Sequence, residues 1–142
     1  MARRLGVVLK RAQHALRTRM DAALRPLGLT TPQYAVLSAV DVEAGISNAR
    51  LARAAFVTPQ TMQGILANLE RDGLLVRQAD PEHGRILRSG LTLEGQSVLV
   101  EAHRVVAAVE NVMISSVGKE EAERIAGLLS QCADALNAMG ED

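Results

Sequence analysis

Apolar residues recur at intervals of three and four over long parts of this chain, the spacing that places them on one face of a helix. Such stripes cover residues 5–27, 98–113 and 125–139. The first ends near a Pro-Leu-Gly turn. The second lies in a predicted helix 93–117 that Thr92 caps and Gly118 ends. The pattern predicts three long amphipathic helices at the two ends of the chain.

Three shorter helices are predicted between these long ones, and each begins at a residue that can cap it. Thr31 and Thr58 each precede a proline, and Ser47 opens a short helix that ends before residue 58. A cap hydroxyl accepts from a free backbone N–H, and proline in the first turn has no N–H to lose. The last of the three helices covers residues 59–71, and its apolar face consists of Met62, Ile65, Leu66 and Leu69.

Two short apolar runs follow this helix, at residues 74–77 and 86–88, and a polar loop containing Pro81 and Gly84 joins them. This arrangement predicts a β-hairpin. Helix, tight turn, helix and hairpin together have the order of a winged helix-turn-helix. The predicted fold class is therefore mainly α with a small β-hairpin wing, flanked by long terminal helices.

The face of helix 59–71 opposite its apolar stripe is suited to DNA. It has no acid before Glu70, so it can approach base edges without charge repulsion, and Gln63 can pair bidentately with adenine. Arg85, the only cation of the loop 78–85, is expected to contact phosphate or the narrow minor groove. The predicted DNA-binding residues are Ser47, Thr58, Pro59, Gln60, Thr61, Gln63, Gly64, Ala67, Arg71, His83, Gly84, Arg85 and Arg88.

These stretches resemble the MarR (multiple-antibiotic-resistance regulator) family of winged helix-turn-helix transcription factors. The resemblance covers nearly the whole chain. It implies an obligate homodimer on a pseudo-palindromic operator of double-stranded DNA, with helix 59–71 in the major groove and the wing arginine in the adjacent minor groove. The matching motifs are Leu29-Thr30-Thr31-Pro32-Gln33-Tyr34-Ala35-Val36-Leu37, Leu51-Ala52, Leu69-Glu70-Arg71-Asp72-Gly73-Leu74-Leu75-Val76-Arg77, Asp80-Pro81, Arg85 and Leu91-Thr92-Leu93-Glu94-Gly95.

The chain departs from the family pattern at three positions. His83 stands where the wing usually has Asp, Gly84 where it has a basic residue, and Gly64 where the reading helix often has a polar or basic residue. Glycine inside a helix costs roughly 1 kcal/mol against alanine. Gly64 is therefore interpreted either as a site of close approach to DNA or as relief of crowding against the core.

We expect one domain over residues 1–142, in which 29–92 form the DNA-binding lobe and 1–28 and 93–142 are dimerisation helices. The terminal helices have more apolar face than so small a lobe can cover, and a symmetric dimer is the commonest solution. A monomeric helical bundle is the alternative.

Composition and charge refine this interpretation. Apolar residues make up 48% of the chain and aromatic residues 1%, a balance that favours helices. The net charge of zero conceals +6 in residues 1–27, −2 in 28–46, +2 in 47–90 and −6 in 91–142. Six arginines make the middle region the cationic part of the candidate site. Opposite charges that simply solvate different faces would account equally well for the two ends.

Chemistry beyond binding has little support in the sequence. Cys132 is the only cysteine, so no intrachain disulfide is possible and a reducing cytoplasm is expected. Family members that sense peroxide carry a cysteine near the N-terminus, and residues 1–30 have none. The three histidines lie on different elements, and no phosphate loop, nucleophile elbow or membrane-spanning run is present. We expect no enzyme activity, no cofactor, no metal and no membrane partner.

The sequence therefore predicts a dimeric DNA-binding transcriptional regulator, a repressor relieved by a small molecule. A small aromatic or anionic effector is expected where the terminal helices meet the DNA-binding lobe, because the first helix is rich in arginine and the family often responds there to aromatic acids. No ligand-binding residues are assigned. The alternatives are a regulator of this fold that senses oxidation or metal, a regulator without an effector, and a helical interaction module that has lost DNA binding.

Overall fold

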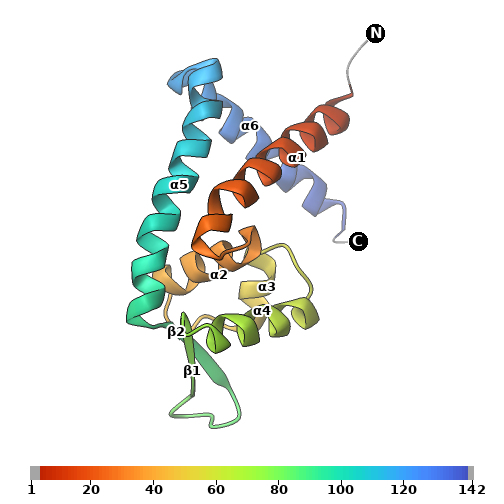
Figure 1. Ribbon diagram of the computed structural model, residues 1–142. Coiled ribbons are helices and arrows are strands. Elements are labelled where there is room, and N and C mark those ends of the chain that lie inside the picture. The colour runs from red at the N-terminus through yellow and green to blue at the C-terminus, as the bar shows by residue number, and fades with distance from the viewer. Residues whose placement is uncertain (1–3, 141–142) are drawn as a thin grey trace. The chain divides into compact units, whose positions relative to one another are not determined.

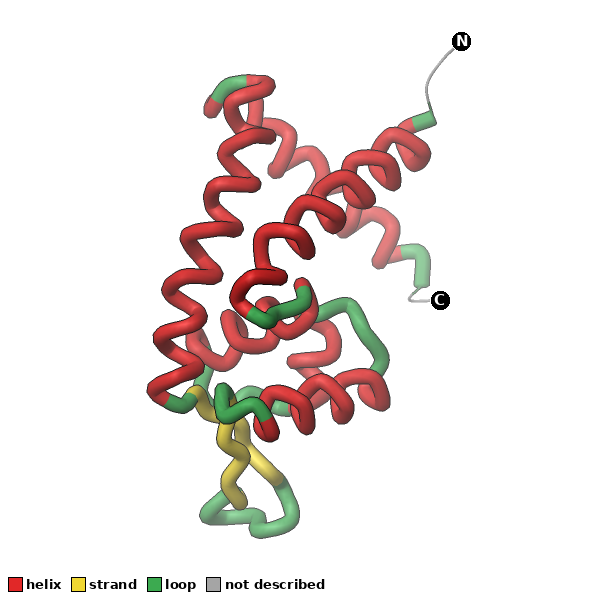
Figure 2. The backbone as a smooth tube through the Cα atoms, viewed as in Figure 1, coloured by secondary structure: helices red, strands yellow, loops and turns green. Residues whose placement is uncertain are grey.

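The computed structural model describes residues 4–140, and most of them are helical, with strands confined to one hairpin (Figure 2). The predicted fold class is confirmed. In chain order the elements are α1 (Leu5–Leu24), η1 (Arg25–Leu27, a 3-10 turn), α2 (Thr31–Val42), α3 (Asn48–Ala54), α4 (Pro59–Arg71), β1 (Leu75–Ala79), β2 (Leu87–Leu91), α5 (Leu93–Val117) and α6 (Lys119–Ala138). The chain divides into two compact units at the Val106–Ala107 bond, which lies within α5.

Three of the four capping residues that the sequence predicts are the caps of helices in the structure. The side chains of Ser47, Thr58 and Thr92 accept hydrogen bonds from backbone N–H groups three residues further on, at 3.3, 3.1 and 2.9 Å. The prediction that Thr31 caps α2 is wrong, because Thr30 is the N-cap and forms a reciprocal capping box with Gln33. The Thr31 hydroxyl instead donates to Asp21 of α1 at 2.5 Å.

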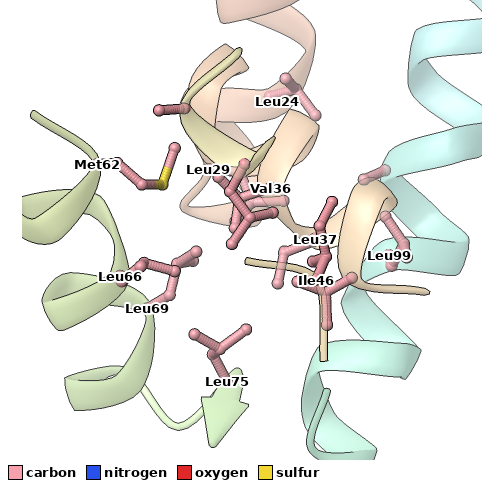
Figure 3. Close-up of a cluster of buried hydrophobic side chains, with 14 of the residues drawn as sticks. Leu24, Leu29, Val36, Leu37, Ile46, Met62, Leu66, Leu69, Leu75 and Leu99 are labelled. Atoms are coloured by element: carbon pink, nitrogen blue, oxygen red, sulfur yellow. The ribbon is translucent and has the colours of Figure 1, made fainter. Parts of the chain in front are cut away.

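The core of the first unit lies between α4, the helices α2 and α3, and the start of α5 (Figure 3). Met62, Leu66 and Leu69 of α4 are fully buried and face this core, while Ile65 is partly buried beside it. The predicted apolar stripe of α4 is thus the stripe that packs. Because one face of α4 is held by the core, its opposite face is presented to solvent in a fixed orientation.

The two strands form an antiparallel hairpin that projects beyond the rest of the first unit, next to the C-terminal end of α4 (Figure 1). The register pairs Leu75 with Leu91 and Ala79 with Leu87, so β2 extends three residues beyond the predicted run. The backbone N–H of Gly45, in the loop after α2, donates to the Ser89 carbonyl at 2.9 Å. This bond ties the base of the wing to the helix-turn-helix.

The first turn of α5 is fixed to the turn that follows α4. Thr92 makes two of the contacts: its hydroxyl donates to the Gly73 carbonyl at 2.6 Å, and its N–H donates to the Leu74 carbonyl at 3.2 Å. A Cβ at Gly95 would lie only 2.1 Å from that same Leu74 oxygen. The close approach of helix and turn therefore depends on glycine at this position.

The second unit consists of the last part of α5 and the whole of α6, joined at Gly118, which has a φ of 93°. A cleft of about 530 Å³ between the two helices is lined mainly by apolar side chains, among them Met113, Ile125 and Leu129. No residue of α6 is buried. Within residues 4–140, no helix is both long enough and apolar enough to span a membrane.

Candidate nucleic-acid interface

The polar face of α4 is open to solvent, as predicted. Gln60, Thr61 and Gln63 are exposed in its first turns, and so are Thr58 and Pro59 at its start and Gly64, Ala67 and Arg71 further along. A Cβ added at Gly64 would meet nothing within 4 Å. Crowding against the core therefore does not explain this glycine, and an approach of the helix backbone to DNA stays a prediction.

A cleft of about 540 Å³ lies beside this face, between α4, the loop before α3 and the wing. Four of the predicted residues meet there, namely Ser47, Gln63, Arg85 and Arg88. Arg50 and Arg77 also line it, and Glu43 is the one carboxylate among the lining residues. Three of the four guanidinium groups have a carboxylate partner in the protein, and the fourth, that of Arg85, leaves the cleft with a net positive charge. A polyanion is therefore the ligand that the cleft favours.

The wing loop is organised by Asp80, whose side chain is almost fully buried. One carboxylate oxygen accepts from the backbone N–H groups of Glu82 at 2.7 Å and His83 at 3.2 Å. The other oxygen accepts from Nε of Arg88. These bonds, the Glu82 N–H first and then the Arg88 guanidinium, hold the pKa of Asp80 below its ordinary value of 3.8.

The two predicted arginine contacts of the wing differ in their surroundings. Arg88 is engaged by the protein, through Asp80 and through an Nη1 bond to the Gly45 carbonyl at 2.8 Å. We interpret Arg88 as a brace of the wing, and its DNA contact stays a prediction. Arg85 is exposed in the loop and has no ion-pair partner within residues 4–140. Its guanidinium is therefore free to meet phosphate. The loop residues His83 and Gly84 are exposed as well.

Two further arginines belong to this surface, although the sequence analysis did not assign them as contacts. Arg50 pairs with Glu43 at 2.6 Å at the rim of the cleft. Arg77 is 14% exposed and lies 3.6 Å from Glu70. Strand alternation is the signal that could have identified Arg77. Residues two apart in a strand lie on the same side, so Arg77 shares the side of β1 that holds the buried Leu75.

Sites for other chemistry are not apparent in the part of the chain that the structure describes. Within residues 4–140, no group of three or more His, Cys, Asp and Glu side chains could hold a metal ion. The ring of His103 is instead engaged by Tyr34, with Nδ1 and the phenol oxygen 2.7 Å apart. Cys132 is half-buried and has no disulfide partner.

An exposed reading helix held by a core, a cationic cleft and a braced wing define a winged helix-turn-helix DNA-binding protein. Residues 27–86 match the model of the MarR family. The HTH-type transcriptional repressor Rv2887 of Mycobacterium tuberculosis (strain H37Rv) is 42% identical to the chain over 106 residues, which are 75% of this chain and 76% of the repressor. The chain belongs to the MarR family, and it is a DNA-binding transcriptional regulator.

Solved structures of the family agree with this assignment. The crystal structure of Rv2887 in complex with salicylic acid has a TM-score of 0.76 and 34% identity, over 92% of this chain and 97% of that one. The transcriptional repressor CouR bound to a 23-mer DNA duplex has a TM-score of 0.86 and 27% identity, over 92% of each chain. The predicted family and fold class are thereby confirmed, together with the general function.

Proposed function

We propose that the protein is a homodimeric repressor that binds a pseudo-palindromic operator and leaves it when a small anionic aromatic effector binds. The observation that supports this best is the cationic cleft between the exposed face of α4 and the wing. The protein acts by occupying DNA and not by catalysis. We place it in the cytoplasm, where a bacterial regulator meets the chromosome.

On the operator, the N-terminal half of α4 enters the major groove. Recognition helices contact bases through their N-terminal residues, and the first turns of α4 carry the exposed side chains of Gln60, Thr61 and Gln63. Gln60 and Gln63 are the side chains that can pair with base edges. Arg85, together with the other arginines of the cleft, neutralises the flanking phosphates and positions the helix.

A second copy covers the apolar surfaces that each unit exposes. Leu5 and Val7 of α1 are exposed in the first unit, and Val112 of α5 and Leu136 of α6 in the second. Exposed apolar area of this extent marks an interface. A two-fold dimer also supplies the two reading helices that a pseudo-palindrome needs. Residues 1–28 and 93–142 are thus proposed as the dimerisation helices, and 29–92 as the DNA-binding lobe.

The proposed effector site is a cleft of about 400 Å³ at the C-terminal end of α1, lined by Arg17, Asp21, Arg25, Gly28, Leu29 and Thr30. Asp21 is engaged there, by the Thr31 hydroxyl first and then by Arg17, and these bonds hold its pKa below its ordinary value of 3.8. Arg25 has no ion-pair partner within residues 4–140, so it is the cation that an effector carboxylate can pair with. The salicylic acid complex of Rv2887 supports the choice of effector class.

The test is the salt dependence of binding between the full-length protein and duplex DNA from upstream of its own gene. We expect log K to fall linearly with log salt, and Arg85→Ala to flatten the slope by about one unit. The matched control is Arg104→Ala, because Arg104 is an exposed arginine of α5 paired with Glu101. If the wild type shows no salt-dependent binding to any duplex, the proposal is wrong. If the wild type binds with the expected salt dependence and Arg85→Ala leaves the slope unchanged, the wing lies outside the interface.

A further inference from the structure

Phe56 has an unusual conformation and an unusual environment. It lies in the turn between α3 and α4 and has a φ of 56°. Among residues 4–140, no other residue except glycine has a positive φ. It is also the only phenylalanine of the sequence, and the residue is 94% exposed. Bulky L-residues rarely adopt this left-handed conformation, because Cβ crowds the following carbonyl oxygen.

The turn itself explains why the backbone is left-handed here. The N–H of Phe56 donates to the Arg53 carbonyl at 3.2 Å, and the N–H of Val57 donates to the Ala52 carbonyl at 3.0 Å. These two bonds form a Schellman motif that closes α3, and glycine is the usual residue at the left-handed position. Phenylalanine at this position is locally unfavourable twice, through its backbone and through its exposed ring. In the folded protein without DNA, no packing of the Phe56 side chain offsets either cost.

The position of Phe56 along the chain places it beside the reading end of α4. Two peptide units separate it from Thr58, the N-cap, so the two Cα atoms are at most about 7.6 Å apart. Thr58, Pro59 and Gln60 are exposed at this end. When these residues enter the major groove, the Phe56 ring is therefore within reach of the edge of that groove.

We propose that Phe56 is a DNA-contacting residue whose ring packs against apolar surface of the operator beside the N-terminus of α4. The apolar groups available there are the C5-methyl group of thymine and the deoxyribose of the backbone. The inference rests on the proposed function and adds to it a contact of a different kind. The ring carries no charge, so it releases no counterions, and its contribution to log K is independent of salt.

Three substitutions separate the ring from the backbone strain. Phe56→Leu keeps an apolar side chain, Phe56→Ala removes the ring and keeps the strain, and Phe56→Gly removes both. We expect the Ala and Gly variants to bind operator about tenfold more weakly, with the slope of log K against log salt unchanged, and the Leu variant to lose less. The Gly variant should also melt about 3 °C higher than wild type, because glycine adopts positive φ without strain.

The matched control is Val42→Ala. Val42 is an apolar residue that is 88% exposed at the end of α2, and it lies outside the proposed dimerisation helices and does not line the cationic cleft. Its loss should leave operator affinity unchanged.

Operators in which each thymine in turn is replaced by deoxyuridine identify the DNA partner. If one such replacement weakens the wild type and has no further effect on Phe56→Ala, the ring contacts that thymine methyl group. If Phe56→Ala binds operator more weakly and no replacement affects the two proteins differently, the thymine methyl groups are excluded and deoxyribose is the apolar partner that is left. Both outcomes support the proposal.

Other outcomes overturn it. If the wild type binds operator and the Ala and Gly variants bind equally well, this inference fails while the proposed function stands. A shift of these variants toward monomer in analytical ultracentrifugation would assign the ring to the interface between protomers instead. Absence of DNA binding by the wild type would instead mean that the proposed function itself is wrong.

Discussion

At the scale of single residues, Asp80 organises the wing of the candidate site, because it joins the wing loop to Arg88 and through it to Gly45. Its lowered pKa means that folding favours the ionised carboxylate. The resulting stabilisation is present in full above the ordinary pKa of 3.8 and is lost as the pH falls through the lowered value.

We therefore expect Asp80→Asn to melt at a lower temperature than wild type near neutral pH, because the amide cannot replace the carboxylate in all of these bonds. The difference in melting temperature should shrink as the pH falls below 3.8 and through the lowered pKa, because Asp80 then becomes protonated in the wild type. Scanning calorimetry across this range measures it. Asp134→Asn, an exposed position of α6, is the control and should track wild type throughout. A difference independent of pH would show that the charge of Asp80 is not what holds the wing.

Gln63 is exposed on α4 and also lines the cationic cleft, which suits a residue that reads a base. Gln63→Ala should relax preference at one symmetric pair of operator positions by about 1–2 kcal/mol and leave non-specific affinity nearly intact. Competition binding against a library of single-base operator variants measures this, with Gln131→Ala of α6 as the control. An equal loss on all sequences would mean that Gln63 only positions the backbone.

Single-residue roles were predictable from sequence where they depend on near neighbours. The exposure of Gln60, Gln63 and Arg85 follows from helix and hairpin periodicity alone. The engagement of Arg88 does not, because one of its partners, Gly45, lies 43 residues away in sequence. The strained turn at Phe56 was also missed, because the absence of glycine hides a left-handed position.

At the scale of elements, the joint between α5 and the turn after α4 leaves no room for a side chain at Gly95. Gly95→Ala would bring a methyl group to about 2.1 Å from the Leu74 carbonyl oxygen, a backbone atom that cannot move without shifting the turn. We expect a loss of about 2 kcal/mol in the free energy of unfolding, even after the gain in helix propensity. Denaturant unfolding measures it.

Gly64→Ala is the matched control for that experiment, since its Cβ would meet nothing within 4 Å in α4. It should stabilise the protein by up to about 1 kcal/mol through helix propensity. If Gly95→Ala proved equally stabilising, the close contact of α5 with the turn would not exist in solution.

Element limits were largely predictable because caps and breakers are local signals. The predicted helices 59–71 and 93–117 agree with α4 and α5 at both ends. The start of α2 was assigned to the wrong threonine because Thr30 and Thr31 are adjacent candidates, and only the reciprocal bond of Gln33 decides between them. The length of β2 depends on pairing across the hairpin, which a run of apolar residues does not report.

At the scale of the whole molecule, the proposed control mechanism links the cleft at the end of α1 to the spacing of two reading helices. The half-sites lie about one helical turn apart, so a small change at the dimer arms misplaces both helices together. An effector that favours the misplaced state by ~3 kcal/mol weakens operator binding roughly a hundredfold. By reciprocity, operator DNA weakens effector binding by the same factor.

Calorimetric titration of salicylate into the free and the DNA-bound protein tests this coupling. We expect binding to the free protein and roughly a hundredfold weaker binding to the complex. Arg25→Ala should weaken binding because Arg25 lines the cleft, whereas Arg19→Ala in the preceding helix α1 should not. Salicylamide, which lacks the carboxylate, should bind more weakly than salicylate to the wild type and equally to Arg25→Ala. Equal affinity of salicylate for the free and the DNA-bound protein would rule out the allosteric mechanism even though the compound binds. Absence of binding to either form would leave a repressor that is controlled by its own concentration.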